Sequence, residues 1–285
     1  MGVICLFPGQ GSQVKGMGAE LFDRYPDWTA AADGVLGYSI RELCVDDPRN
    51  ELALTQFTQP ALFVVNAMTY RAKRDDGLAA PSYLAGHSLG EYNALLAAGC
   101  FDFSTGLTIV NERGRLMSLV GGGGMAAVVG LDPGKIREIL GASEAGRLVD
   151  VANFNTFDQT VIAGPKDALE AVKPLFEQAG VRLFIPLNVS APFHSRYMRE
   201  PQSQFGAFLK DFQFAGPSIE VIANVNGRPY QHDLVRQILS EQIGNSVQWL
   251  ESMLYLLRQP EPEFIECGPG AVLTKMLAQI RKRLK

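Results

Sequence analysis

The chain has 285 residues, 47% of them hydrophobic, and its 26 Lys and Arg against 30 Asp and Glu give a formal net charge of −4. This composition supplies a packed core and excludes a disordered chain, while the slight acidic surplus argues against a nucleic-acid-binding protein. No apolar run approaches the roughly 20 residues that span a bilayer, so we expect a cytoplasmic protein with no membrane attachment.

The first 120 residues alternate between strand-like and helical patterns. Short apolar runs at residues 3–7 and 82–85 are typical of buried strands. Residues 89–98 and 104–120 show helical periodicity, and Ser104 is the predicted N-cap of the second helix. This alternation favours an α/β domain built on a parallel sheet.

A second pattern begins after the four glycines at residues 121–124, which indicate a flexible hinge. Strands and helices then follow in the order β-α-β-β-α-β, which is typical of a ferredoxin-like unit. The expected elements lie at residues 125–129, 133–140, 148–153, 160–163, 167–179 and 181–187. We therefore predict a ferredoxin-like subdomain over residues 123–189, inserted into a larger α/β domain formed by residues 1–122 and 190–285. The alternative is that these elements extend one continuous sheet.

Ser88 lies in the sequence GHSLG at residues 86–90, which fits the G-x-S-x-G pattern. The pattern follows a predicted strand and opens a predicted helix, and a tight turn in that context presents the serine hydroxyl clear of the backbone. Amide N–H groups at the N-terminus of the helix can stabilise a negative charge that develops beside the hydroxyl. Ser88 is therefore the candidate nucleophile, although an ordinary strand-to-helix turn would fit the same letters.

A serine nucleophile needs a base, and the chain has three histidines. His87 adjoins the serine on the turn and is expected to support it, while His232 lies in a polar surface stretch. His194, in a loop that follows a predicted strand, is the candidate general base. Its orienting partner is open at this point, because Asp150 and Asp158 lie between serine and histidine in the chain and a backbone carbonyl would also serve.

Arg113 stands on the apolar face of the predicted helix over residues 104–120. It lies three residues after Val110 and four before Met117, both of which belong to that face. A guanidinium on a core-facing stripe is costly unless a negative group meets it. The partner is either an internal acid, with Glu91 as the candidate, or the carboxylate of a substrate, whose two oxygens match the planar guanidinium. The second interpretation predicts an acyl donor that carries its own negative charge.

Seven segments of the chain occur in the order found in one enzyme family. They are FPGQGSQ at residues 7–13, GHSLGE at 86–91, RG at 113–114, NFN at 153–155, PFHS at 192–195, VQW at 247–249 and GPG at 268–270. Together they resemble the malonyl-CoA:acyl carrier protein transacylases of fatty acid and polyketide synthesis, and the resemblance covers essentially the whole chain. The sequence around GHSLGE and PFHS is most similar to the free-standing, trans-acting acyltransferases that serve polyketide synthases without such a domain.

The resemblance implies a hydrolase-like α/β domain with an inserted ferredoxin-like subdomain and an active site in the cleft between them. Ser88 would be acylated by malonyl-CoA, and the malonyl group would then pass to the phosphopantetheine thiol of an acyl carrier protein, with His194 moving the proton in both steps. The family is often monomeric, and the four scattered cysteines of this chain lack the spacing of metal ligands. We therefore expect a monomer that binds malonyl-CoA and a carrier protein, with neither cofactor nor metal.

The resemblance also assigns supporting groups to the two reactive residues. The backbone N–H groups of Gln10 and Leu89 would form the oxyanion hole, and the main-chain carbonyl of Gln248 would orient His194. A carbonyl in this role gives a Ser-His dyad and fits the lack of a convincing acid. Loss of one oxyanion-hole hydrogen bond costs about 3–4 kcal/mol in other enzymes.

Four residues are expected to hold the substrate: Arg113, Phe193, Asn155 and Met117. The resemblance implies that Arg113 binds the free carboxylate of the malonyl group. Phe193 stands where malonyl-selective acyltransferases of polyketide synthesis carry Phe and methylmalonyl-selective ones usually carry Ser, because an aromatic ring leaves little room for an α-methyl branch. A pocket that excludes one methyl group discriminates only about 10–200-fold, so malonyl is the predicted preference and the preference is incomplete.

Two other functions are compatible with parts of this pattern. A proofreading acyl hydrolase of the same family would remove stalled acyl groups from carrier proteins, but a carboxylate clamp at Arg113 is useless for neutral chains. A non-catalytic module that binds carrier proteins would need neither Ser88 nor His194. The basic residues 281–285 are either a docking patch for an acidic carrier protein or the solvated end of a helix.

Overall fold

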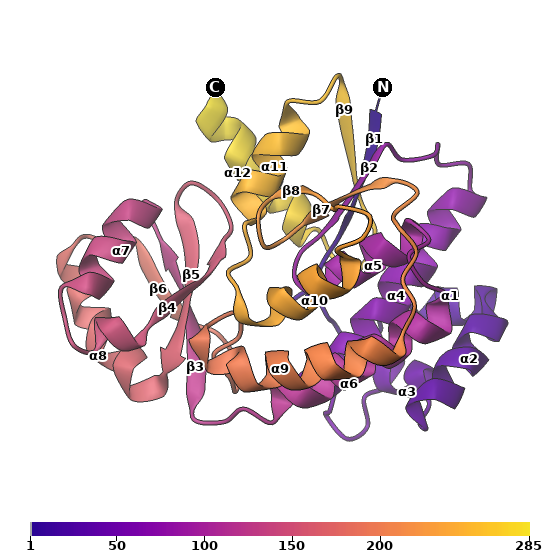
Figure 1. The fold of residues 1–285 in the computed structure, drawn as a ribbon, viewed down its shortest axis with the longest axis horizontal. Coiled ribbons are helices and arrows are strands. Elements are labelled where there is room, and N and C mark those ends of the chain that lie inside the picture. The colour runs from indigo at the N-terminus through magenta and orange to yellow at the C-terminus, as the bar shows by residue number, and fades with distance from the viewer. Residues whose placement is uncertain (1) are drawn as a thin grey trace.

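Residues 2–285, which the computed structural model describes, contain a five-stranded sheet at the centre of the larger domain (Figure 1). Its strands are β1 (Gly2–Phe7), β2 (Tyr83–Gly86), β7 (Glu220–Ala223), β8 (Arg228–Pro229) and β9 (Pro262–Glu266). They lie side by side in the order β8-β7-β2-β1-β9. The strands β7, β2, β1 and β9 are parallel, and β8 joins the edge in the antiparallel direction. The parallel sheet expected from the sequence is confirmed.

The helices of the larger domain come from both halves of the chain. They are α1 (Ala19–Arg24), α2 (Pro26–Leu36), α3 (Ile40–Val45), α4 (Thr55–Asp75), α5 (Gly90–Ala97), α6 (Phe103–Ser118), α9 (Arg199–Phe208), α10 (Val235–Gly244), α11 (Trp249–Leu257) and α12 (Val272–Leu284), with short 3₁₀ turns at Arg196–Met198 and Leu209–Asp211. None of the helices within residues 2–285 combines the length and the apolar character that a membrane crossing requires.

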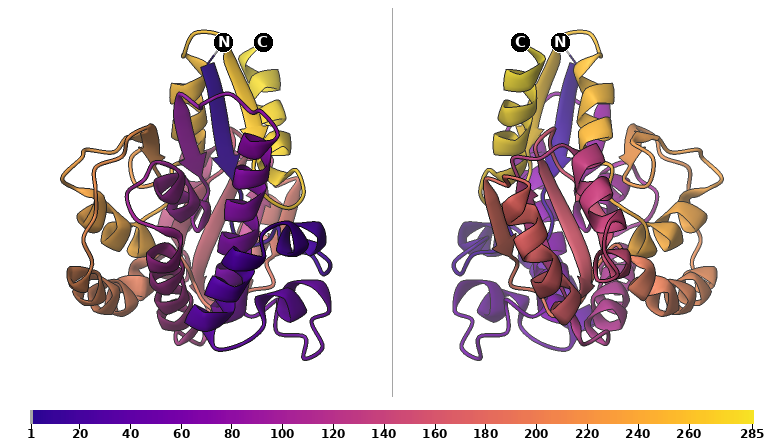
Figure 2. Two further views of the ribbon diagram at one scale, coloured as in Figure 1. Left: turned by 90° about the vertical axis from the view of Figure 1, so that its right-hand side faces the viewer. Right: turned by 90° about the vertical axis from the view of Figure 1, so that its left-hand side faces the viewer.

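Helices cover both faces of the five-stranded sheet (Figure 2). Because successive side chains of a strand point to opposite faces, β1 contributes to two cores. Val3, Cys5 and Phe7 pack in the core that includes α4, α5 and α6. Ile4 and Leu6 pack on the other face, against α11 and α12. This two-sided burial explains why the first strand is an unbroken apolar run.

The described residues also form a four-stranded antiparallel sheet in a smaller subdomain (Figure 1). Its elements are β3 (Gly123–Val129), α7 (Pro133–Gly141), a 3₁₀ turn (Gly146–Leu148), β4 (Asp150–Phe154), β5 (Gln159–Pro165), α8 (Lys166–Gln178) and β6 (Leu183–Pro186). The strand order is β4-β5-β3-β6, so each helix connects two strands that are not neighbours, as in a ferredoxin-like unit. The two sheets are separate, and the alternative of one continuous sheet is therefore wrong.

The inner face of the small sheet lies against the larger domain. Ala126 of β3 packs outward in the core with α7 and α8, whereas Met125 and Ala127 belong to the core of the larger domain. The backbone N–H of Phe154 in β4 donates to the carbonyl of Val247, just ahead of α11, at 2.9 Å. The two units therefore meet along one side of the small sheet, next to the carboxyl end of β2.

Candidate active site

Ser88 stands on a sharp turn between β2 and α5. Its backbone φ is 52°, in the left-handed region that residues with a side chain rarely adopt. The flanking glycines make the turn possible. A Cβ at Gly86 would lie 1.9 Å from the carbonyl carbon of Gly90, and a Cβ at Gly90 would lie 2.0 Å from the carbonyl oxygen of Phe7. The G-x-S-x-G segment therefore has the strained geometry expected of a nucleophile turn.

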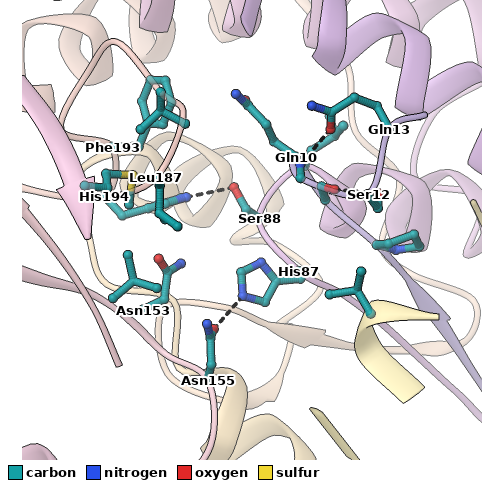
Figure 3. Close-up of a pocket in the computed structure, with 18 of the residues that line it drawn as sticks. Gln10, Ser12, Gln13, His87, Ser88, Asn153, Asn155, Leu187, Phe193 and His194 are labelled. Carbon is teal, nitrogen blue, oxygen red and sulfur yellow. Dashed lines mark hydrogen bonds between the residues drawn. The ribbon is translucent and has the colours of Figure 1, made fainter. Parts of the chain in front are cut away.

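Ser88 and His194 form a hydrogen-bonded pair (Figure 3). Ser88 Oγ is 2.7 Å from Nε2 of His194, and Nδ1 of His194 is 2.9 Å from the main-chain oxygen of Gln242. Because a carbonyl only accepts, Nδ1 carries the proton and Nε2 is left to accept the proton of the serine. Burial of the imidazole, together with the charge of Arg113, lowers the pKa of His194 to about 3, so the ring is neutral at pH 7. A neutral ring with Nε2 toward the hydroxyl can act as a general base.

The carbonyl that orients His194 belongs to Gln242, so the expected role of Gln248 is wrong. Gln248 precedes α11, and its carbonyl accepts hydrogen bonds from the backbone N–H and the hydroxyl of Ser252. Gln242 lies in the last turn of α10, where helix carbonyls have no intrahelical N–H to bind. Its carbonyl is therefore available to the histidine.

The two acids that precede His194 in the chain bind elsewhere. Asp150 forms an ion pair with Arg196, and Asp158 forms one with Arg182. Within residues 2–285 no carboxylate contacts His194, so Ser88 and His194 form a hydrogen-bonded dyad without an acid.

Arg113 is 1% exposed and its guanidinium reaches the reactive serine. Nη2 donates to Ser88 Oγ at 3.1 Å and to Gln242 Oε1 at 3.0 Å, and Nη1 donates to Gln59 Oε1 at 2.6 Å. None of these acceptors, among the residues that the structure describes, is a carboxylate. Glu91, the candidate internal acid, binds the side chain of Gln242, which lies between it and the guanidinium. The positive charge of Arg113 is therefore not directly paired.

The dyad opens into a cavity of about 360 Å³ between the two units (Figure 3). The small sheet contributes Met125 and Ala127 of its inner face to the wall. The wall also includes every residue that the sequence predicted for the site except Gln248. These residues are Gln10, Ser88, Leu89, Arg113, Met117, Asn155, Phe193 and His194. The structure therefore brings them together, while their roles in binding an oxyanion or a substrate stay predictions.

His87 and Asn155 link the two units at the cavity (Figure 3). Nε2 of His87 donates to Oδ1 of Asn155 at 2.9 Å, and the ring centroid of His87 lies 5.4 Å from that of Trp249. Burial lowers the pKa of His87, so the ring is neutral. His87 thus fastens the nucleophile turn to the small subdomain, and Asn155 has a structural hydrogen bond besides its predicted contact with a substrate.

Two buried glutamines that contact Arg113 were not predicted from the sequence. Gln242 lies on the apolar face of α10, four residues after Ile238, and Gln59 lies on the buried side of α4, four residues before Phe63. A polar residue on an apolar helix face is the same signal that identified Arg113, so helical spacing can find both. The signal is weaker for glutamine because a neutral amide is less costly to bury than a charge.

Known proteins share this chain's sequence and fold. The family described as "Acyl transferase domain" matches residues 4–284. The polyketide biosynthesis malonyl CoA-acyl carrier protein transacylase PksC of Bacillus subtilis (strain 168) is 50% identical over 278 residues, which cover 97% of this chain and 96% of PksC. The polyketide biosynthesis protein ThaF of Burkholderia thailandensis is 52% identical over 275 residues, which cover 96% of this chain but 24% of ThaF. A crystal structure of malonyl CoA-acyl carrier protein transacylase from Burkholderia pseudomallei has a TM-score of 0.96 at 51% identity and 99% coverage of each chain.

The family match includes the whole site described above, because residues 4–284 contain every residue named in the cavity wall. The solved relative covers both sheets, which confirms the predicted fold class of an α/β domain with a smaller subdomain. The chain therefore belongs to the acyl transferase family, and its resemblance to malonyl-CoA:acyl carrier protein transacylases is confirmed over nearly its full length.

Proposed function

We propose that this chain moves a malonyl group from malonyl-CoA to the phosphopantetheine thiol of an acyl carrier protein, through an acyl-enzyme on Ser88. The observation that carries the proposal is the place of Arg113, a buried guanidinium that lies 3.1 Å from Ser88 Oγ without a carboxylate partner among residues 2–285. An acyl donor whose far end is an anion supplies the missing charge, and malonyl is such a donor. The activity in the name of PksC supports the same conclusion.

In the first step Nε2 of His194 removes the proton from Ser88 Oγ as the oxygen attacks the thioester carbonyl. We assign the backbone N–H groups of Gln10 and Leu89 to the oxygen of the tetrahedral intermediate. The bond from carbon to the CoA sulfur then breaks, and the imidazolium gives its proton to that sulfur. CoA leaves as a thiol, and the malonyl ester remains on Ser88.

In the second step the thiol of the carrier protein takes the place of CoA. His194 accepts the proton of this thiol, the sulfur attacks the ester carbonyl on Ser88, and the serine oxygen leaves with the proton from the imidazolium. Each step forms one bond to the acyl carbon and breaks another, so the same base and the same oxyanion hole serve both. Two half-reactions through one covalent intermediate predict ping-pong kinetics.

Malonyl is the preferred acyl group because Phe193 lines the cavity and is 5% exposed. Its ring leaves little room for the α-methyl branch of methylmalonyl.

Similarity to PksC and ThaF, both named as polyketide biosynthesis proteins, favours a carrier protein of polyketide synthesis over one of fatty acid synthesis. All four cysteines are free and buried, which fits the reducing environment of the cytoplasm.

The proofreading hydrolase is not favoured by this geometry. A neutral acyl chain would leave Arg113 buried beside Ser88 without a counter-charge, which is costly. A non-catalytic binding module is not favoured either, because a hydroxyl 2.7 Å from a neutral imidazole serves no purpose in a docking surface.

Mass spectrometry after incubation with malonyl-CoA tests the proposal. We expect one malonyl group on the peptide that contains Ser88, and none in Ser88→Ala, because the acyl group is carried by the serine oxygen. Addition of a phosphopantetheinylated carrier protein should remove the adduct and yield malonyl carrier protein. Ser118→Ala, at the end of α6, is the matched control and should load like the wild type. Free malonate formed as fast as CoA is released, with no malonyl carrier protein, would identify a hydrolase instead.

A further inference from the structure

Behind the nucleophile turn lies Glu91, a buried carboxylate that neither reaction step touches. It is 0% exposed and stands three residues after Ser88, in the first turn of α5. Within the described part of the chain its oxygens accept hydrogen bonds from the hydroxyl of Tyr230, from Gln242 Nε2 at 2.9 Å and from the backbone N–H of Asn224 at 2.9 Å. Each of these groups donates, so the site fits an ionised carboxylate.

Asn224 connects Glu91 to the backbone of the nucleophile turn. Its Oδ1 accepts from the N–H of Ser88 at 2.7 Å, and its Nδ2 donates to the carbonyl of Gly86 at 2.7 Å. The side chain therefore holds the turn on both sides of a serine whose backbone is strained. Because the backbone N–H of Asn224 donates to Glu91, the position of the Asn224 side chain depends on the carboxylate of Glu91.

Gln242 connects Glu91 to the other reactive groups. Its Nε2 also donates to the carbonyl of Ser88 at 2.8 Å, its Oε1 accepts from Arg113 at 3.0 Å, and its main-chain oxygen accepts from His194 at 2.9 Å. The side-chain amide thus lies between an anion and a cation, with its N–H toward Glu91 and its oxygen toward Arg113. Reversing the amide would place repulsive charges at both contacts, so the negative charge of Glu91 fixes its orientation.

Filling space in the core does not account for this arrangement. Burial of a carboxylate is costly, and an apolar side chain would fill the same space at lower cost. In a Ser-His-acid triad a carboxylate orients the histidine directly, whereas His194 has no such contact within residues 2–285. Glu91 is a buried acid that does not touch Ser88 or His194 itself. It is linked to both through one intervening residue, Gln242.

We propose that Glu91 is a positioning residue for acyl transfer: its negative charge orients the side chain of Gln242 and thereby holds Arg113 in place for the carboxylate of the substrate. This inference rests on the malonyl transfer proposed above. It requires that the charge at this position, and not only the shape of the side chain, decides how well the site distinguishes malonyl from acetyl.

The charge of Glu91 depends on pH near neutrality. Burial raises the pKa of Glu91 to about 7, against the hydrogen bonds from its partners and the charge of Arg113, which lower it. The titratable groups that face it are Tyr230, Tyr92 of its own helix and Arg113, with His194 on the far side of the guanidinium. Burial raises the pKa of both tyrosines and lowers that of His194, so these three keep one charge state around pH 7. A change in malonyl loading near this pH therefore reports on Glu91.

The test compares Glu91→Gln with the wild type in single-turnover loading of Ser88 from malonyl-CoA and from acetyl-CoA. Glutamine has nearly the same shape as glutamate. Its side-chain oxygen can accept the hydrogen bonds from Gln242 and Asn224 while its NH₂ group faces Tyr230, so the substitution removes the negative charge and keeps the shape. We expect malonyl loading to fall about 10–100-fold and acetyl loading far less, with most of the malonyl loss in KM. Wild-type malonyl loading should rise as the pH passes about 7, and the variant should lack this rise.

Tyr230→Phe is the matched control, because it removes one hydrogen bond to Glu91 and leaves the charge. In this variant the pKa of Glu91 should be higher than in the wild type, so the rise in malonyl loading should move to higher pH. Above that pH the preference for malonyl over acetyl should equal that of the wild type. This variant decides the question if Glu91→Gln does not fold. Equal losses for malonyl and acetyl, or an unchanged pH profile in both variants, overturn the inference. A wild type that forms no malonyl adduct on Ser88 overturns the proposed function instead.

Discussion

The charge of Arg113 acts on the side chains of both Ser88 and His194. Its hydrogen bond to Ser88 Oγ favours the deprotonated hydroxyl, and its field contributes to the low pKa of His194, which weakens that group as a base. In the proposed mechanism, a malonyl carboxylate bound to the guanidinium would offset the field at the histidine. His194 would therefore be a stronger base when an anionic acyl group occupies the cavity, whereas an acetyl group would have no such effect.

Arg113→Ala should lower malonyl loading by about 100-fold, because the variant cannot form the two hydrogen bonds proposed between the guanidinium and the malonyl carboxylate. Acetyl loading should change less than tenfold or increase, since no carboxylate is involved and the histidine becomes a stronger base. Single-turnover loading with each thioester measures both. Arg115→Ala, an exposed arginine on the same helix paired with Glu112, is the matched control and should load like the wild type. Equal losses for the two thioesters would remove the clamp from the mechanism.

At the scale of elements, the N-cap of α6 lies two residues before the predicted one. The expected N-cap was Ser104, but the helix begins at Phe103 and the carboxylate of Asp102 accepts the N–H of Thr105 at 2.8 Å. Asp102 has the extended backbone of an N-cap, whereas Ser104 lies within the first turn and uses its carbonyl for the hydroxyl of Thr108. Helical periodicity locates the body of a helix, but its first residue depends on which nearby side chain reaches the free N–H groups.

Asp102→Ala should lower the free energy of unfolding by about 1 kcal/mol, because the N–H of Thr105 loses its acceptor at the start of α6. Urea denaturation measures the change. Ser104→Ala removes the hydroxyl that the sequence predicts as the N-cap, and it should change the free energy of unfolding by less than about 0.5 kcal/mol. A larger loss for Ser104→Ala than for Asp102→Ala would contradict this assignment of the cap.

Hydrophobic periodicity and glycine spacing predicted those features of the fold that are formed by residues close together in the chain. The β-α-β-β-α-β order of the small subdomain and the turn around Ser88 follow from periodicity and glycine spacing, and both are present in the structure. The sequence predicts the carbonyl of Gln248 as the partner of His194, but the structure has that of Gln242, because the resemblance identifies only a segment and the packing of α10 against His194 selects the residue. The sequence offers Glu91 as a partner of Arg113, but the side chain of Gln242, which lies between them, belongs to a helix more than a hundred residues away in the chain.

At the scale of the whole molecule, three buried titratable groups make stability depend on pH. Burial lowers the pKa of His194 and His87 below the ordinary value of 6.5, so the folded protein binds fewer protons than the unfolded chain just below pH 6.5. These histidines therefore lower the free energy of unfolding as the pH falls. Glu91 acts in the opposite direction, because its raised pKa lets the folded protein keep a proton between the ordinary value of 4.5 and about 7. The contribution of Glu91 to the free energy of unfolding is therefore lost as the pH rises from 4.5 to about 7.

His194→Gln should reduce the loss of stability on acidification. For one buried neutral histidine the free energy of unfolding falls by up to about 1.4 kcal/mol for each pH unit below 6.5, and the variant lacks this contribution while His87 retains its own. Urea denaturation at about pH 7 and about pH 5.5 measures the slope. Identical slopes in the wild type and the variant would show that His194 is not buried in the neutral form.

The pairing of β1 with β9 joins the two ends of the chain, with Gly2 opposite Pro262, and both termini lie at the same end of the molecule (Figure 2). On the ribosome β1 has no partner on that side until residues 8–261 have been made. The small subdomain, which is contiguous in sequence, completes its sheet earlier and is expected to fold first. A translation product that stops before β9 would expose an unpaired apolar strand edge, which makes incomplete chains prone to aggregation and dependent on chaperones.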